Sequence, residues 1–166
     1  MFRTSHLNGM MSKGLDVGAI APDFSLPSTD GNFVLHDRLA HGPILLVFYP
    51  GDDTPVCTKQ LCDYRDNLSV FEDLGVQVAA INKQGIASHD RFSKKHQLPF
   101  PLLADENKAV CKAYGAIGLL GMVKRALFLV GEDRVIRYRQ VDLPMFRKTA
   151  EELREALTGR VDSVPN

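Results

Sequence analysis

Residues 43–62 read PILLVFYPGDDTPVCTKQLC, and this stretch decides the fold. It opens on a continuously apolar run, residues 43–49, which is typical of a strand buried on both faces. A loop over residues 50–55 follows, with a proline at each end. Residues 56–73 then place apolar side chains at helical spacing. A buried strand therefore leads, through a stiff loop, into a helix that carries Cys57 in its first turn.

The rest of the chain alternates short apolar runs with amphipathic segments. We expect further strands at residues 33–35, 76–81, 102–104, 126–130 and 135–139, the last two as a hairpin, and further helices at residues 86–96, 105–114 and 146–157. Residues 18–27 are expected to be an irregular lead-in, and Ser88 is a candidate cap for the helix at 86–96. This order predicts an α/β protein with a central mixed β-sheet flanked by helices on both faces. A thioredoxin-like arrangement fits it.

The composition is that of an ordinary globular domain. The chain has 166 residues, of which 45% are apolar and 24% charged, and its formal net charge is zero. There is no basic run and no apolar stretch of membrane-spanning length, so we expect neither a nucleic-acid nor a membrane partner. We expect residues 1–13 to form a disordered extension, residues 14–158 one domain, and residues 159–166 a frayed tail.

The three cysteines are Cys57, Cys62 and Cys111. An odd, low count argues against a disulfide-stapled secreted domain and predicts reduced thiols in the cytoplasm. We interpret Cys111 as a buried structural thiol, because it belongs to no motif. Cys57 and Cys62 lie within loose ligand spacing for zinc, but the sequence has no second close pair of Cys or His. We therefore expect no metal and no cofactor.

Cys57 lies where a helix favours a charged sulfur. The first turn of a helix carries free backbone N–H groups and the positive end of the helix dipole, and both favour a thiolate over a thiol. Lys59 adds positive charge nearby, and Thr54 can place a hydroxyl near the sulfur. Pro50 and Pro55 stiffen the intervening loop. The segment therefore predicts a partly exposed, reactive cysteine nucleophile.

These residues resemble those of the peroxiredoxins, in the subgroup of the bacterioferritin comigratory protein and peroxiredoxin Q. The pattern Pro-x-x-x-Thr-x-x-Cys stands here as Pro50, Thr54 and Cys57. A second cysteine follows five residues later at Cys62, and Arg125 opens the late strand in KRALFLV. The resemblance continues through GAIAPDFSLPSTDG and LPFPLLADENKAVCKAYG to the closing helix. It covers most of the chain, and the combined motif is far more specific than any of its parts.

The resemblance implies a thioredoxin-like fold and a thiol peroxidase that reduces hydrogen peroxide and organic hydroperoxides. Cys57 would attack the peroxide and become a sulfenic acid. Thr54 and Arg125 would bind the peroxide oxygens, and Pro50 would shield the site from water. Cys62 would resolve the sulfenic acid to an intramolecular disulfide, which a thioredoxin-like reductant would reduce. A monomer is expected, because such a disulfide needs no partner subunit.

The spacing of Cys57 and Cys62 adds a geometric expectation. Five residues along one ideal helix give about 7.5 Å of rise and about 140° of rotation. The two Cα atoms are then roughly 8.6 Å apart on an ideal helix, beyond the limit of about 7 Å for a disulfide. We therefore predict that the first turns of this helix unwind before the two cysteines bond.

Other interpretations stay open at this stage. Cys62 could be a spectator, with a partner thiol resolving Cys57. A thiol-disulfide oxidoreductase is a further alternative, although such proteins use Cys-x-x-Cys and a late cis-proline, whereas this chain has four residues between its cysteines. A redox sensor or chaperone is the remaining one. We interpret all five histidines as surface or hydrogen-bonded structural residues, and Asp52 and Asp53 as polar loop residues.

Overall fold

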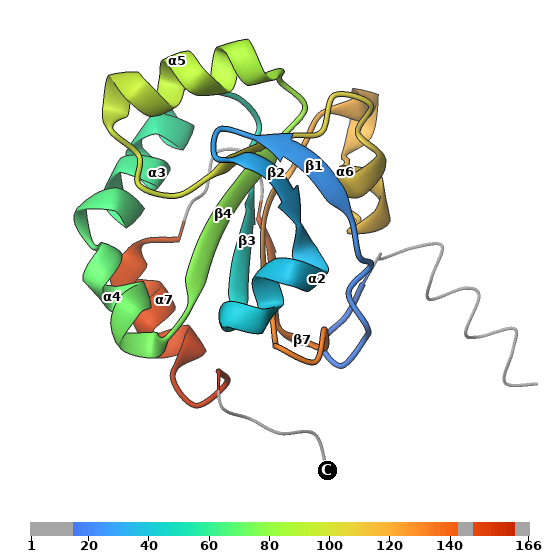
Figure 1. The fold of residues 1–166 in the computed structure, drawn as a ribbon, viewed down its shortest axis with the longest axis vertical. Helices are drawn as coiled ribbons and strands as arrows, with labels where there is room; N and C mark the ends of the chain where they lie inside the picture. The colour runs from blue at the N-terminus through green and yellow to red at the C-terminus, as the bar shows by residue number, and fades with distance from the viewer. Residues whose placement is uncertain (1–14, 143–147, 162–166) are drawn as a thin grey trace, which may run out of the picture.

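The computed structural model describes residues 15–142 and 148–161, which contain one seven-stranded sheet in the order β2-β1-β5-β4-β3-β6-β7 (Figure 1). The strands are β1 (Ser25–Ser28), β2 (Gly31–Val34), β3 (Ile44–Phe48), β4 (Gln77–Asn82), β5 (Leu102–Ala104), β6 (Arg125–Val130) and β7 (Ile136–Asp142). Strands β3, β4 and β5 run parallel, and the other pairs are antiparallel. The sheet is mixed, as predicted, and β6 and β7 form the expected hairpin. The predicted extension over residues 1–13 lies outside the described residues.

Helices cover both faces of the sheet (Figure 1). They are α2 (Leu35–Arg38), α3 (Pro55–Asp66), α4 (Leu68–Leu74), α5 (Ile86–His96), α6 (Ala109–Ala113) and α7 (Ala150–Leu157), with 3₁₀ turns η1 (Leu39–His41) and η2 (Leu119–Gly121). Helices α3, α4, α5 and α7 pack on one face, and α2 and α6 pack on the other. This arrangement confirms the predicted α/β class. Within the described residues, no helix has the length and apolar character needed to span a bilayer.

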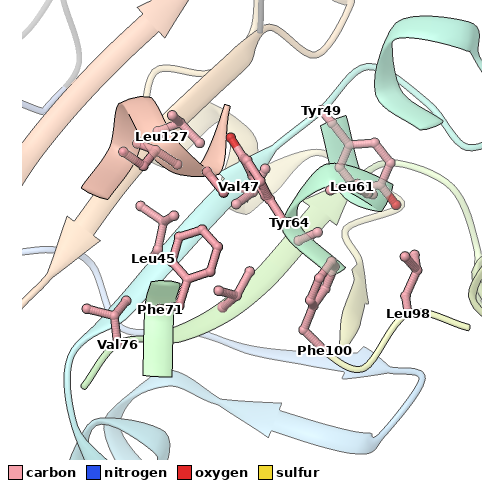
Figure 2. Packing of buried hydrophobic residues seen from close by; sticks show 14 of the residues in the cluster. Leu45, Val47, Tyr49, Leu61, Tyr64, Phe71, Val76, Leu98, Phe100 and Leu127 are labelled. Atoms are coloured by element: carbon pink, nitrogen blue, oxygen red, sulfur yellow. The ribbon is translucent and has the colours of Figure 1, made fainter. Parts of the chain in front are cut away.

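The central strand β3 supplies side chains to both halves of the core, because all of its residues are buried. Leu45 and Val47 face the layer that contains α3 and α4 (Figure 2). In that layer Tyr64 and Phe71 meet edge to face, with ring centroids 5.5 Å apart. A fully buried side chain of this kind stabilises the fold by roughly 1.5–3 kcal/mol. The C-terminal end of β3, from which the loop to Cys57 leaves, is therefore firmly held.

The helix predicted over residues 56–73 is two helices. Asn67 leaves the helical conformation, with φ −119° and ψ 33°, and separates α3 from α4. Its side-chain amide donates to the backbone oxygen of Asp63 at 2.9 Å, which satisfies one of the carbonyls at the end of α3. Gly75, in the left-handed conformation at φ 71°, ends α4 as expected.

The helix predicted over residues 105–114 is shorter, because Lys108 adopts a left-handed conformation with φ 61°. The helical residues begin only after it. Asp105 nevertheless caps this helix through its side chain, accepting from the backbone N–H groups of Val110 at 3.3 Å and Cys111 at 2.7 Å. The Asp105 carboxylate therefore accepts hydrogen bonds from free N–H groups in the first turn of α6, although Asp105 itself lies before the helix.

Strand β1 begins within the region predicted to be an irregular lead-in, residues 18–27, and extends one residue beyond it. It pairs with β2 along its whole length, from Ser25 opposite Val34 to Ser28 opposite Gly31. Its apolar pattern is weak because it reads SLPS, and its proline lacks the N–H that a strand interior requires. Pairing with β2, rather than its own pattern, makes this segment a strand.

Candidate active site

Cys57 lies in the first turn of α3, at the end of the loop that leaves β3. Thr54 is the N-cap residue, with extended φ −80° and ψ 147°, and Pro55 occupies the first helical position. The Thr54 side chain makes no capping hydrogen bond to this turn. The N–H groups of Val56 and Cys57 therefore remain at the positive end of the helix dipole, where they favour an anion.

The Cys57 side chain is fully buried, so the expectation of a partly exposed thiol is wrong. It lies on the apolar stripe of α3, together with Leu61 and Tyr64, and this stripe packs against the sheet. A position on this apolar stripe would also suit Cys57 if it were only a small buried core residue with no chemical role. The polar neighbours of Cys57 decide between these two interpretations.

Arg125 is the principal polar neighbour of Cys57. Its Nη2 donates to Cys57 Sγ at 3.1 Å, and the residue is only 1% exposed. Arg125 opens β6, in which Ala126 pairs with Phe48 at the end of β3. The register therefore brings a guanidinium from late in the chain to the loop that follows β3. A buried cation in contact with a sulfur stabilises the thiolate form.

Gln60 holds the other side of the guanidinium, and sequence reasoning missed it. Its Oε1 accepts from Arg125 Nη1, and its Nε2 donates to the Tyr64 hydroxyl at 3.1 Å. Tyr64 in turn donates to the backbone oxygen of Lys148 at 2.6 Å. Burial raises the pKa of Tyr64, so the phenol stays protonated and able to donate. The available sequence signal was a polar residue one turn after Cys57 on an otherwise apolar face.

The loop between β3 and α3 carries the other predicted site residues. Pro50 is half-buried, and Thr54 is exposed with its hydroxyl donating to the Gly51 oxygen at 3.2 Å. Gly51 lies close to the Gln84 side chain, because a Cβ at this position would be 3.1 Å from Gln84 Oε1. The loop thus runs tightly against the turn that precedes α5.

Asp52 is buried, so its interpretation as ordinary loop polarity is wrong. Its carboxylate accepts from the Tyr49 hydroxyl at 2.6 Å and the Ser88 hydroxyl at 2.7 Å, and it meets His89 Nδ1 at 2.8 Å. Burial acts to raise the pKa of Asp52, but the hydrogen bonds from His89, Tyr49 and Ser88 outweigh it and hold that pKa below its usual value. Burial, with Asp52 nearby, raises the pKa of Tyr49.

Helix α5 supplies two of these partners. It matches the predicted residues 86–96, but its N-cap is Gly85, so the expectation that Ser88 caps it is wrong. Ser88 and His89 instead face the loop. His89 is a buried, hydrogen-bonded histidine, as expected, with its Nε2 3.0 Å from the backbone oxygen of Leu103.

The three cysteines are free thiols in this structure. Cys57 and Cys62 lie on the uninterrupted helix α3, and Cys62 is partly exposed. Cys111 is buried on α6 as expected; burial, with a hydrogen bond to Asp105, raises the pKa of its thiol. Among the described residues, no group of three or more His, Cys, Asp or Glu side chains could hold a metal ion.

Comparison with known proteins agrees with this geometry. Residues 17–139 match the AhpC/TSA family. The peroxiredoxin bcp of Coxiella burnetii is 39% identical over 129 residues, covering 74% of this chain and 85% of that protein. The chloroplastic peroxiredoxin Q of Arabidopsis thaliana is 39% identical over 136 residues, covering 81% of this chain but only 63% of that protein.

The fold agrees as well. The solved structure of the Xanthomonas campestris bacterioferritin comigratory protein, described in terms of alkyl peroxide reduction, superposes with a TM-score of 0.76 at 25% identity. The superposition covers 89% of this chain and 98% of the Xanthomonas chain. The α/β fold is therefore the thioredoxin-like fold of these proteins. By family match, relatives and fold, the chain belongs to the AhpC/TSA family, among the peroxiredoxins of the bcp and Q kind, and it is a thiol peroxidase.

Proposed function

We propose that Cys57 is the peroxidatic nucleophile. Its thiolate attacks one peroxide oxygen, the O–O bond breaks, and Cys57 becomes a sulfenic acid while the other oxygen leaves as water or an alcohol after taking up a proton. The contact that carries this proposal is the 3.1 Å hydrogen bond from Arg125 Nη2 to Cys57 Sγ. It places a fixed positive charge where negative charge moves during the reaction.

Thr54 and Pro50 are proposed to complete the peroxide site. Thr54 is the residue from which α3 starts, one turn before Cys57, so its hydroxyl can turn from the Gly51 oxygen to a peroxide oxygen. Pro50 is half-buried at the start of the same loop and would limit access of water to the sulfur. Both roles follow the family pattern and the position of the loop.

Cys62 is proposed to resolve the sulfenic acid. Its thiol attacks Cys57 Sγ, a water molecule leaves, and an intramolecular disulfide forms. A thioredoxin-like dithiol would then reduce this disulfide by exchange. Because both cysteines lie on one chain, we propose a monomer. Three free thiols suit a reducing compartment, so we propose the cytoplasm.

The substrates are proposed to be hydrogen peroxide and organic hydroperoxides. The Xanthomonas protein is described for alkyl peroxide reduction, and the two proteins share their fold. Comparing initial rates with hydrogen peroxide and with an alkyl hydroperoxide, at equal reductant, tests this breadth. A rate with only one of the two would overturn it.

A cysteine series tests the proposed roles. Peroxide consumption is measured with a thioredoxin system for the wild type, Cys57→Ser, Cys62→Ser and Cys111→Ser. Cys57→Ser should show no turnover, Cys62→Ser should be oxidised once but recycle poorly, and Cys111→Ser should behave nearly as the wild type. Turnover by Cys57→Ser would overturn the proposal.

A further inference from the structure

The buried pair of Asp52 and His89 lies outside the groups proposed to touch peroxide, and its role is unassigned. The side chains are 1% and 0% exposed, and Asp52 Oδ2 lies 2.8 Å from His89 Nδ1. Such a pair is costly to bury unless its hydrogen bonds are satisfied. Here the Tyr49 and Ser88 hydroxyls bond to Asp52, and the backbone oxygen of Leu103 lies 3.0 Å from His89 Nε2.

The geometry fixes where the protons of His89 lie. Its Nε2 faces the backbone oxygen of Leu103 at 3.0 Å, and a carbonyl oxygen can only accept. Its Nδ1 faces a carboxylate oxygen that already accepts from Ser88. The other carboxylate oxygen of Asp52 accepts from Tyr49. The hydrogen bonds that hold the pKa of Asp52 low favour its carboxylate form, so both ring nitrogens of His89 face oxygen atoms that accept hydrogen bonds.

Ser88, His89 and Asp52 do not form a hydrolytic triad, although the residue types match one. Ser88 donates to Asp52 rather than to His89, at 2.7 Å. The imidazole nitrogen that would act as a base faces the Leu103 oxygen instead. No ring nitrogen is left to take the Ser88 proton, so this cluster does not activate a nucleophile.

The partners of Asp52 instead attach the loop over residues 50–54 to α5 and the turn before it. The Asp52 backbone N–H donates to Gln84 Oε1 at 2.5 Å, in addition to the bonds with Ser88 and His89. On the same side, Lys95 on α5 contacts Asp53 at 3.3 Å. The loop leads into α3 at one end, yet most of its anchoring bonds come from a different helix.

Tyr49 connects this anchor to the buried cluster that contains Cys57. Its ring packs in the same buried cluster as Cys57, whereas its hydroxyl donates to Asp52. The pair therefore holds the loop that bears Thr54 and also a ring in the cluster around Cys57. A small misplacement of groups that bind a reacting molecule can cost up to about a hundredfold in rate.

We propose that the Asp52–His89 ion pair positions the loop over residues 50–54 for peroxide binding, acting through Thr54 and Tyr49 rather than by touching peroxide. Asp52 and His89 are thus positioning residues for the reaction at Cys57. This inference rests on the proposed function of Cys57. It predicts that weakening the pair slows reaction with peroxide but leaves the intrinsic reactivity of the Cys57 sulfur unchanged.

The test compares two reagents under single-turnover conditions. Reduced protein is mixed with hydrogen peroxide or with iodoacetamide, and the modification of Cys57 is followed by mass spectrometry. Asp52→Asn and His89→Gln should lower the peroxide rate constant by about tenfold or more, with little change in the alkylation rate. His89→Asn is the conservative variant, because its amide N–H occupies the place of Nδ1 and keeps the bond to Asp52. It should restore most of the peroxide rate.

The controls separate this inference from the function on which it rests. His41→Asn changes an exposed histidine on η1 and should react as the wild type. A wild type that does not react with peroxide at Cys57 would overturn the proposed function. If the wild type reacts with peroxide and the Asp52→Asn and His89→Gln variants react equally fast, only the positioning role is overturned. The same holds if the variants lose peroxide reactivity and alkylation by iodoacetamide to the same extent.

A measurement on the unmodified protein covers the case in which these variants fold poorly. The ¹⁵N chemical shifts of the histidine rings report whether each nitrogen carries a proton, and the His89 ring is assigned in the wild type through its bonds to the assigned His89 backbone. Protons on both ring nitrogens at neutral pH support the ion pair. An unprotonated Nδ1 would overturn it.

Discussion

Arg125 on β6 donates to the sulfur of Cys57 on α3 at 3.1 Å, although 68 residues of chain separate them. The same guanidinium donates to Gln60, one turn further along α3. A planar group with several donors can serve both partners at once, which fixes its position over the sulfur. The pairing of β3 with β6 therefore completes the sheet and also places the Arg125 guanidinium beside the Cys57 sulfur.

Replacing this guanidinium by an ammonium group tests the importance of its shape. Arg125→Lys keeps the charge but loses the paired donors, so we expect the rate of Cys57 oxidation by hydrogen peroxide to fall about 10²–10³-fold. Single-turnover oxidation measures this rate. Arg91→Lys, an exposed change on α5, is the control. A rate close to the wild type would show that charge alone suffices.

The hydrogen bonds that Gln60 makes with Arg125 and Tyr64 give a second prediction. Gln60→Leu removes the acceptor for Arg125 and the donor for Tyr64, so it should slow peroxide reduction and lower the free energy of unfolding by about 1–3 kcal/mol. Tyr64→Phe leaves Arg125 and Gln60 in contact, so it should lower stability with a smaller effect on rate. Urea unfolding and single-turnover kinetics measure the two effects. A larger loss of peroxide reduction rate in Tyr64→Phe than in Gln60→Leu would contradict this prediction.

Oxidation is expected to unwind the first turns of α3. In the structure Cys57 and Cys62 lie on one continuous helix, where an ideal geometry keeps their Cα atoms roughly 8.6 Å apart. Amide hydrogen exchange at residues 57–63 should accelerate in the disulfide form relative to the reduced form. Oxidised Cys62→Ser, which cannot close the bond, is the matched control. Unchanged protection in the wild type would contradict the unwinding.

The buried thiol of Cys111 gives a prediction for alkaline pH. Burial and Asp105 raise its pKa in the folded protein above that of the unfolded chain. The folded state therefore keeps a proton that the unfolded state releases, and stability falls as pH rises above about 8.5. In Cys111→Ala this part of the decline should disappear. Chemical unfolding between pH 7 and 10 under reducing conditions measures it, and parallel pH profiles for the two proteins would contradict it.

Local signals predicted much of this structure. The continuous apolar run gave β3, the helical spacing placed Cys57 on the stripe of α3, and residues 86–96 matched α5. The pattern shared with a known family led to Arg125, whose contact with Cys57 the structure then shows. No composition or periodicity argument would have chosen Arg125 over other arginines.

Long-range polar partners could not be predicted from local patterns. Gln60 meets a residue 65 positions away, and Asp52 meets His89 across 37 positions. Each looks like an ordinary polar residue in its own segment, because its purpose depends on the packing of α3 and α5 on the sheet. The break at Asn67 was missed for a similar reason, since the apolar spacing continues through it.

That break also sets where the rearranged part of the molecule ends. Asp63 accepts from Asn67 through its backbone oxygen, and its carboxylate accepts from the Ala150 N–H at the start of α7 at 2.7 Å. The second half of α3 is thus fastened to another helix, directly after Cys62. Oxidation would then change the surface shape of the protein in the first turns of α3, up to residue 63. A reducing partner that recognises this region would bind the disulfide form and not the reduced form. Reduced molecules would then not compete for the reductant.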